Sequence, residues 1–508
     1  MSLRSLEDLL HTTETVKKIE RTAIQKSGFS VAQLMARASK ALLDELLQEF
    51  GEPRQLTVFC GTGNNAGDGY TIAALAVNEG ISVRVVEVGD RSKMLPDVTH
   101  ARSIAEQAAV DFCDCQTPLD LDQGIIVDAL LGTGLRGELQ QDYRRAIRQI
   151  NDALLPVVAV DVPSGLNADT GAVADAAVMA DLTVTFIAPK RGLFTGRAAV
   201  FCGEIIWHSL DLPNAGYSDY PPSAKLLDVD RALENLPMRA ADAYKSQLGH
   251  VMVVGGDRGF GGAAIMAAQA CLRVGAGLVS LATRPEHVAA MLARQPEIMA
   301  TAIVSGQALE PLLTRASVLV LGPGLGRSAW SEQLLQKALD AGLPTLLDAD
   351  ALNIIAEGRI AVDPQVSRWV MTPHPGEAAR LLNISVREIE ADRFAAVAQL
   401  RDKYSAVVIL KGPGSLVIGT SGDPIGVCTY GNAGMASGGM GDVLAGVVGG
   451  LIAQGLPLQA AAELGCCLHS SAADMAAQQT GQIGLAASDI LPQLRRLLNP
   501  QHSADELL

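Results

Sequence analysis

Aromatic side chains and positive charge are both scarce in this sequence. Phenylalanine, tyrosine and tryptophan make up 4% of its 508 residues, and 40 lysines and arginines against 55 acidic residues leave a formal net charge of −15. Excess negative charge repels nucleic acid and anionic membrane surfaces, so we expect neither as a partner. Few aromatics together with 50 glycines are typical of a loop-rich α/β protein, and the length suffices for two or three domains.

The sequence also lacks an apolar run long enough to cross a bilayer and cysteines at metal-binding spacing, and we expect no leader peptide. Acidic residues interrupt the first 30 positions, where a leader would be apolar. The eight cysteines lie mostly in apolar runs, which is typical of buried free thiols in a reducing compartment. We therefore predict a cytoplasmic protein, and we expect it to form a homo-oligomer.

The most informative stretch is the glycine-rich segment 431–446, which carries one carboxylate, Asp442, at the start of a predicted helix. Glycines let the backbone approach a ligand closely, and the unpaired amides of a helix start offer donors to an anion. The pattern predicts a phosphate-binding turn. A carboxylate beside phosphate is repelled unless it binds a metal or accepts a proton, so Asp442 is interpreted as a general base. The alternative is an ordinary helix cap.

Four loops upstream of this turn each follow an apolar stretch that is typical of a buried strand. They lie at residues 322–326, 348–353, 372–377 and 411–415. In an open parallel α/β sheet, loops at the carboxyl ends of the strands converge on one crevice, so these loops predict one composite site. The glycine loop that begins with Lys411 would fit a nucleotide phosphate.

The first half carries a comparable pattern. An apolar strand over 56–60 ends in the glycine segment 61–69, and a helix is expected over 70–77. The glycines fit a dinucleotide fingerprint, although an ordinary strand-to-helix turn explains them as well. Asn64, Asn65 and Asp68 argue against a standard dehydrogenase. The carboxylate would repel a pyrophosphate, and the two side-chain amides suit a sugar, an amide or a cation better.

Two more predicted strands in this half end in Asp128 and Asp161. A glycine loop with an arginine follows Asp128, and a Val-Pro-Ser-Gly turn follows Asp161. Asn65, Asp128 and Ser164 offer only oxygen ligands, which suits a hard cation and excludes a zinc-type site. The alternative is that each aspartate caps the turn that follows it.

The second half, from about residue 240, resembles the ribokinase-like fold and, within it, the ADP-dependent NAD(P)H-hydrate dehydratase family. The most specific segments are Asp-Ala-Asp-Ala-Leu-Asn at 348–353 and Thr-Pro-His-Pro-Gly-Glu at 372–377, in family order. The resemblance implies that Asp442 is the catalytic base, that ADP is the co-substrate, and that magnesium takes part. It implies substrate contacts from Ala263, Gly326, His374 and Asp442, and ADP contacts from Lys411, Gly412, Pro413, Gly414, Ser415 and Gly441. A loop or core histidine is the alternative for His374.

The first half, about residues 10–212, resembles the NAD(P)HX epimerase domain, a Rossmann-like α/β/α fold. The resemblance rests on the segments 61–69, 128–137, 161–171 and 188–190, again in family order. It implies that Asp161 is the acid/base and that Asn65, Asp128 and Ser164 bind potassium. It implies substrate contacts from Asn64, Asn65, Ala66, Gly67, Asp68, Gly132, Thr133, Gly134, Leu135, Arg136, Gly137, Glu138 and Asp161.

The first half departs from that family at one place. Ala36 and Ser39, within the predicted helix 31–39, stand where the family more often has a glutamate and a glycine. We therefore assign no site residue to this helix.

Two such halves on one chain resemble the bifunctional NAD(P)H-hydrate repair family. We expect a two-domain α/β protein with an N-terminal Rossmann-like epimerase domain over 1–212, a proline-rich linker and bridging segment over 213–240, and a ribokinase-like dehydratase domain over 241–508. Hydration of nicotinamide at C6 gives R and S epimers. A stereospecific dehydratase would restore one of them, and an epimerase would supply it from the other.

Two other functions stay open at this point. A ribokinase-like kinase of a vitamin precursor, with an accessory dinucleotide-binding domain, would use the same base and anion-binding turn but release a stable phosphorylated product. A noncatalytic nucleotide sensor would bind AMP or ADP without turnover. Against the sensor stands the position of Asp442 and Asp161, because carboxylates are costly to hold near phosphate without a function.

Overall fold

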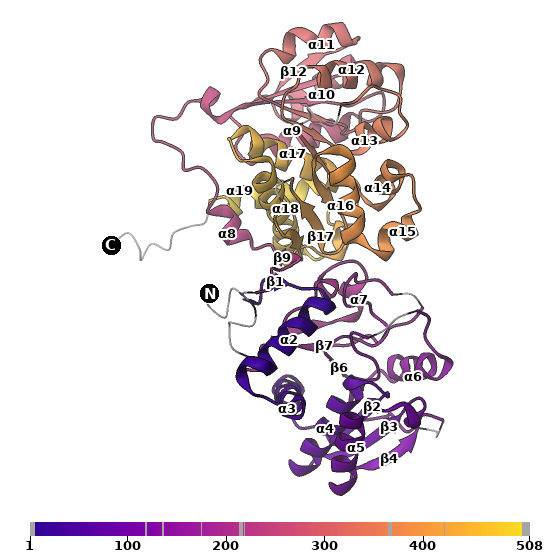
Figure 1. Ribbon diagram of the computed structural model, residues 1–508. Helices are drawn as coiled ribbons and strands as arrows, with labels where there is room; N and C mark the ends of the chain where they lie inside the picture. The colour runs from indigo at the N-terminus through magenta and orange to yellow at the C-terminus, as the bar shows by residue number, and fades with distance from the viewer. Residues whose placement is uncertain are drawn as a thin grey trace. The chain divides into compact units, whose positions relative to one another are not determined.

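The computed structural model describes residues 6–116, 119–134, 137–173, 175–212, 217, 219–363, 368–420 and 422–499. The chain divides into two compact units, Met1–Lys225 and Leu226–Leu508, and both are drawn in Figure 1. Within the predicted linker 213–240, residues 213–216 and 218 lie outside the described residues. The described part of that segment contains strand β9 (Ala224–Leu226) and helix α8 (Val229–Leu233).

The first unit contains a doubly wound, fully parallel sheet. Its spatial order is β4-β3-β2-β5-β6-β7-β8, and each neighbouring pair is parallel. The order reverses between β2 and β5, because the chain builds first from β2 to β4 and then from β5 to β8. This is the predicted Rossmann-like arrangement. The strands are β2 (Gln55–Cys60), β3 (Ser82–Glu87), β4 (Asp111–Asp114), β5 (Ile125–Ala129), β6 (Val157–Val160), β7 (Leu182–Phe186) and β8 (Glu204–His208), and a short β1 (Leu9–Leu10) pairs with Ala224 and Lys225.

Helices cover both faces of this sheet, which gives three layers. Successive strand residues point to opposite faces, so Val58 packs on the side of α2 to α5 while Phe59 packs on the side of α6. Helix α4 begins at Asn64, earlier than the predicted helix at 70–77, so Asp68 lies in a helix and not in a loop. The helices are α2 (Thr13–Ser27), α3 (Val31–Phe50), α4 (Asn64–Asn78), α5 (Pro96–Gln107), α6 (Gln141–Asp152) and α7 (Ala198–Phe201).

The second unit has its own sheet, in the order β18-β17-β16-β15-β14-β13-β10-β11-β12. The pairs from β16 to β12 are parallel, whereas β17 pairs antiparallel with both β16 and β18. The order reverses between β10 and β13. The strands are β10 (His250–Val254), β11 (Leu278–Thr283), β12 (Met299–Ala302), β13 (Val318–Leu321), β14 (Thr345–Leu347), β15 (Trp369–Met371), β16 (Val407–Leu410), β17 (Ser415–Ile418) and β18 (Ile425–Cys428).

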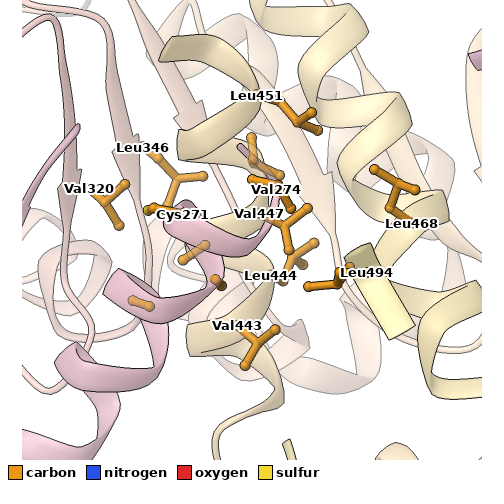
Figure 2. Close-up of a cluster of buried hydrophobic side chains, with 14 of the residues drawn as sticks. Cys271, Val274, Val320, Leu346, Val443, Leu444, Val447, Leu451, Leu468 and Leu494 are labelled. Atoms are coloured by element: carbon orange, nitrogen blue, oxygen red, sulfur yellow. The ribbon is translucent and has the colours of Figure 1, made fainter. Parts of the chain in front are cut away.

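One face of the second sheet carries the main core of this unit. Figure 2 shows side chains from α9, α17, α18 and α19 packed against strand residues such as Val320 and Leu346. The helices of the unit, besides α8, are α9 (Gly261–Arg273), α10 (Pro285–Arg294), α11 (Gly306–Leu313), α12 (Ala329–Asp340), α13 (Ala349–Ala356), α14 (Pro375–Leu382), α15 (Val386–Ala391), α16 (Arg393–Tyr404), α17 (Met440–Ala453), α18 (Leu458–Thr480) and α19 (Ala487–Leu497).

Helices α9 and α17 lie in very close contact and run parallel. Gly446 lies against Ala267 and Ala270, and Gly450 lies one turn further along against Cys271 and Val274. Both helices therefore begin at the same end of the unit. Because glycine has no side chain, the two backbones approach more closely than other residues would permit.

The cysteines are free thiols, as the sequence predicted. Cys113 is partly exposed, and the other cysteines are buried. Across the described part of the chain, no helix combines the length and the apolar character that a membrane crossing requires.

The α9–α17 contact predicts an unusual response to alanine. Gly446→Ala should lower the free energy of unfolding by about 1–3 kcal/mol, because the new methyl group would overlap the carbonyl oxygen of Ala267. Gly262→Ala, on the exposed first turn of α9 with open space around it, should instead leave stability unchanged or raise it by up to about 1 kcal/mol. Scanning calorimetry of both variants measures this. Equal stability of the two would contradict the packing.

Candidate active sites

A cavity of about 570 Å³ lies at the carboxyl ends of the strands in the first unit. It lies between the loops that follow β2 and β5, where the strand order reverses and where doubly wound sheets bind ligands. The predicted residues that line it are Asn64, Asn65, Asp68, Gly132, Thr133, Gly134, Glu138 and Asp161. Ala66 and Gly67 are buried in α4, Gly137 is exposed, and Leu135 and Arg136 lie outside the described residues.

Asp161 is fixed at the wall of this cavity by a buried lysine. Lys190 is 1% exposed, pairs with Asp161 Oδ1, and donates to Thr185 Oγ1 at 3.0 Å and to the Phe186 carbonyl at 2.8 Å. The same Asp161 oxygen accepts from the Thr185 hydroxyl at 3.1 Å and from the Phe186 amide at 3.2 Å. Donors of this kind favour the charged form of a carboxylate. Asp161 also has a φ of +67°, a strained conformation that concentrates at functional sites.

Asn65, Asp128 and Ser164 meet at one corner beside the backbone of Leu131. Buried Asp128 accepts from the Ser164 amide at 2.7 Å and from the Ser164 hydroxyl at 2.6 Å. The Asn65 amide donates to the Leu131 carbonyl at 3.2 Å, and the Leu131 amide donates to Ser164 Oγ at 2.8 Å. Burial raises the pKa of Asp128 to about 6. The corner therefore gathers carboxylate, hydroxyl and carbonyl oxygens, a set that fits a hard cation.

In the second unit, Lys411 joins the loops that follow β14, β15 and β16. Its Nζ donates to Asp348 Oδ1 at 2.8 Å and lies 3.9 Å from Glu377 Oε2. The Thr372 hydroxyl donates to the same Asp348 oxygen at 2.8 Å. The Asp348 and Glu377 side chains are only 2% and 5% exposed, so both depend on this lysine for a counter-charge. Three of the predicted loops thus meet at one point.

Helix α17 places Asp442 in its first turn, beside Lys411. Gly439 caps the helix with a φ of +92°, and a Cβ added at Gly441 would lie 3.2 Å from Lys411 Nζ. Because α9 runs parallel to α17, Ala263 in the first turn of α9 lies at the same end of the unit. Two helix starts with unpaired amides therefore lie beside the strand ends, an arrangement that suits an anion.

The surroundings of Asp442 favour the protonated, uncharged form of its carboxyl group. Burial, aided by the negative charge of Asp348, raises the pKa of Asp442 to about 7, and Lys411 opposes this shift. Burial likewise raises the pKa of Glu377 to about 7. Burial alone would lower the pKa of Lys411, but Asp348 and Glu377 outweigh it and the pKa is raised. The site therefore combines a permanent cation with a carboxyl group suited to proton transfer.

His374 caps helix α14 with its imidazole ring. Its Nδ1 accepts from the Gly376 amide at 2.9 Å, and Nε2 lies 3.3 Å from Glu377 Oε1. Burial, together with the charges of Lys411 and Arg380, lowers the pKa of His374, which favours the neutral ring. The side chain is 49% exposed, so the ring is accessible to a ligand while it serves as a cap.

The predicted nucleotide loop after β16 is anchored by Arg393, which is completely buried. The guanidinium group donates to the carbonyl oxygens of Leu410 at 3.2 Å and Lys411 at 3.1 Å, and it pairs with Glu390 at 3.0 Å. Gly412 lies in contact with the same guanidinium group and has a φ of +142°, which favours glycine. Arg393 therefore fixes the backbone from which the loop starts.

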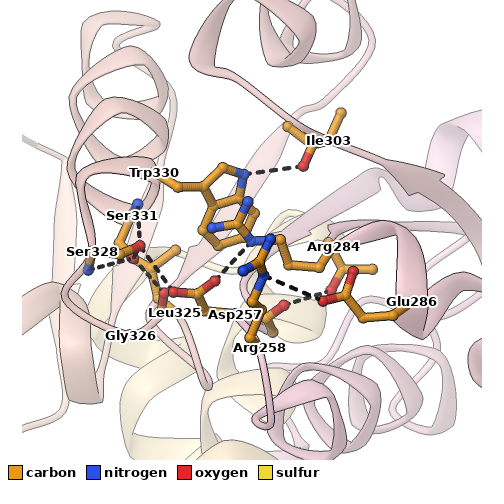
Figure 3. A network of polar contacts seen from close by, with 12 residues as sticks. Asp257, Arg258, Arg284, Glu286, Ile303, Leu325, Gly326, Ser328, Trp330 and Ser331 are labelled. Carbon is orange, nitrogen blue, oxygen red and sulfur yellow. Dashed lines mark hydrogen bonds and ion pairs between the residues drawn. The ribbon is translucent and has the colours of Figure 1, made fainter.

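At the reversal of strand order, Asp257 joins the loops that follow β10 and β13 (Figure 3). It accepts from Arg284 Nε at 2.7 Å and from the Ser328 hydroxyl at 2.9 Å. The Arg284 guanidinium group lies 4.1 Å from the centre of the Trp330 ring. Gly326 lies against Asp257, because a Cβ added there would be 2.9 Å from Oδ2. The network holds the Gly326 loop in place.

Two family models match the chain: NAD(P)H-hydrate dehydratase over residues 251–496 and YjeF-related protein N-terminus over residues 31–192. The chain is 46% identical over 492 residues to the bifunctional NAD(P)H-hydrate repair enzyme Nnr of Coxiella burnetii, covering 97% of this chain and 100% of that one. It is 39% identical over 488 residues to the enzyme of the same name from Escherichia coli K12, covering 96% and 93%. A solved ribokinase-like superfamily protein from Enterococcus faecalis has 29% identity and a TM-score of 0.51, covering 55% of this chain and 96% of that chain.

These features define an α/β enzyme with two candidate sites, one at the reversal of strand order in the first sheet and one where the loops after β14, β15 and β16 meet in the second. The relatives match nearly the whole chain, across both units. The chain belongs to the family of bifunctional NAD(P)H-hydrate repair enzymes. The resemblance predicted from the two halves of the sequence is therefore confirmed.

Proposed function

We propose that the chain repairs hydrated NADH and NADPH at two sites. The first unit epimerises R- and S-NAD(P)HX, and the second dehydrates S-NAD(P)HX to NAD(P)H with ADP, releasing AMP and phosphate. The observation that carries the proposal is Asp442, a carboxyl group with a pKa of about 7 beside Lys411 at a glycine-capped helix start. A base, a cation and an anion-binding turn together are the components that phosphoryl transfer to a hydroxyl requires.

In the dehydratase site, Asp442 takes the proton from the C6 hydroxyl of the hydrated nicotinamide. The resulting oxygen attacks the β-phosphorus of ADP, and the bond to the α-phosphate oxygen breaks, which releases AMP. The amides of Gly438, Gly439 and Gly441 stabilise the charge on the transferring group. The lone pair of the ring nitrogen then expels the phosphate from C6, and loss of a C5 proton restores the dihydronicotinamide ring. Hydroxide would leave far less readily than this phosphate.

The remaining predicted residues hold the two substrates. Lys411, Gly412, Pro413, Gly414 and Ser415 bind the nucleotide phosphates, and the rigid anchor of this loop on Arg393 supports that role. Ala263, Gly326 and His374 bind the hydrated dinucleotide. A magnesium ion would accompany the ADP phosphates, and Asp348 would supply an oxygen ligand of the kind that it prefers.

In the epimerase site, Asp161 is the acid/base, and the cavity residues from α4 and from the loop after β5 hold the hydrated dinucleotide. Asn65, Asp128 and Ser164 would hold a potassium ion. The oxygen-rich corner beside Leu131 supports this, because potassium takes carboxylate, hydroxyl and carbonyl oxygens. When bound, the ion would fix the glycine loop that starts at Gly132.

A direct assay tests the function. Chemically hydrated NADH, supplied as both epimers, should regain dihydronicotinamide absorbance with the nucleotide co-substrate and not without it, and AMP should form one for one with NADH when ADP is used. ATP in place of ADP tests which nucleotide the site prefers. Accumulation of a stable phosphorylated product would instead favour the small-molecule kinase, and nucleotide binding without turnover would favour the sensor.

Asp442 should impose a pH dependence on dehydration. A base must be unprotonated, so kcat for S-NADHX should be low below the pKa, rise through about pH 7 and level off above it. Asp442→Asn should lose about 10²-fold or more in kcat and lose this dependence, while epimerisation is unchanged. Glu377→Gln is the control, since removal of a negative neighbour should move the rise to lower pH and not abolish it. Near-normal turnover by Asp442→Asn would contradict the assignment.

A further inference from the structure

Four carboxyl groups line the epimerase cavity, those of Glu20, Asp68, Glu138 and Asp161, and their surroundings differ. Asp161 accepts hydrogen bonds from Lys190, Thr185 and the Phe186 amide. In the described part of the chain, no hydrogen bond or ion pair holds the side chains of Glu20 on α2, Asp68 on α4 or the exposed Glu138. Because three donors point at Asp161 Oδ1, that oxygen is placed as a hydrogen-bond acceptor and not as a donor. Epimerisation nevertheless needs a donor, because the C6 hydroxyl leaves only after protonation.

Asp68 is the best placed of these three carboxyl groups, and Glu138 is the exposed one. It lies four residues after Asn64 on α4, so both side chains lie on the same face of the helix, and both line the cavity. Burial raises the pKa of Asp68 well above its usual value, and the negative charges of Asp161 and Glu20 add to this. Burial also raises the pKa of Glu20, and Lys190 opposes the shift at both groups. Because Asp68 lies beside Asn64 on the cavity wall and its pKa is raised well above the usual value, it is the carboxyl group best suited to carry the proton.

We propose that Asp68 is the proton donor of the epimerase site and that Asp161 is its proton acceptor. This rests on the proposed epimerase function. It assigns the two halves of the acid/base role to separate residues, in the way that pairs of carboxyl groups with different surroundings divide such roles elsewhere.

The proposed step conserves atoms and electrons. Asp68 gives its proton to the C6 oxygen, the C6–O bond breaks, and its electron pair leaves with a water molecule. The lone pair of the ring nitrogen forms a C=N bond, which makes C6 planar. A water molecule then adds to the opposite face of C6, the C=N pair returns to nitrogen, and the water gives its proton to Asp161. Nothing is oxidised or reduced. The step leaves Asp68 ionised and Asp161 protonated, so Asp161 then releases a proton to solvent water and Asp68 takes one up from it, which returns both carboxyl groups to their starting state.

The donor role predicts a particular pH profile. Epimerisation by the unaltered protein should fall as the pH rises through the pKa of Asp68, because only the protonated form donates. Asp68→Asn should lose about 10²-fold or more in kcat and lose this alkaline fall. Glu20→Gln should keep the fall but move it to lower pH, since one of the negative charges that raise the pKa of Asp68 is removed. Lys17, Glu138 and Lys190 also line the cavity, and neither variant alters them.

Two further measurements test the exchange of the C6 oxygen and the folding of the Asp68→Asn variant. In water labelled with ¹⁸O, each inversion at C6 should introduce one solvent oxygen into the product, and inversion without label would overturn the proposed step. Dehydratase activity of the Asp68→Asn full chain reports that the variant has folded. An unchanged alkaline fall in Asp68→Asn, or its loss in Glu20→Gln alone, would overturn the assignment of Asp68. Absence of epimerisation in the unaltered protein would instead defeat the function on which it rests.

Discussion

In both units the chain reverses its direction of growth in the middle of a parallel sheet, and polar groups gather at that reversal in each unit. The loops after β2 and β5 separate in the first unit, and those after β10 and β13 separate in the second, because their following helices cover opposite faces. Each separation leaves an opening that the strand ends can line with polar groups. The cavity of the first unit and the Asp257 network of the second both lie at these points. The epimerase site thus uses the reversal directly, and in the second unit the reversal holds the Gly326 loop.

A lysine beside an aspartate sets the charge balance at each site. Lys190 pairs with Asp161 in the first unit and Lys411 with Asp348 in the second, and in each case the lysine lies at a strand end or the loop after it. Removing charged groups from water is costly unless they are paired and hydrogen-bonded, so each pair requires its partner to be present. A neighbouring buried carboxyl group has no lysine of its own. Burial therefore raises its pKa, as it does for Asp442 and Asp68. For Asp442, with a pKa of about 7, proton transfer near neutral pH follows from this contrast.

The sequence predicted the strand ends well and the contacts between them poorly. Apolar runs followed by glycine and aspartate identify the ends of β5, β6, β14 and β16, because buried parallel strands are continuous apolar segments. The predicted start of α4 was wrong. Gly67 and Gly69 look like loop residues in the sequence, but they lie inside the helix, where Gly67 packs against Met35 and Gly69 against Cys60. The roles of Lys190, Asp348, Glu377, Arg393 and Asp257 were missed. Those residues act through partners that are distant in sequence, and no local pattern marks such a pairing.

The central claim is that one chain carries two separable activities on one substrate, and Asp161→Asn tests it most directly. The variant is given an equal mixture of the two epimers of hydrated NADH with ADP, and the recovery of NADH absorbance is followed against AMP formation. The account predicts a fast phase limited to the S epimer, then a slow phase at the spontaneous rate of epimerisation, with AMP and NADH equal throughout. Repair of the whole mixture in a single fast phase would contradict it.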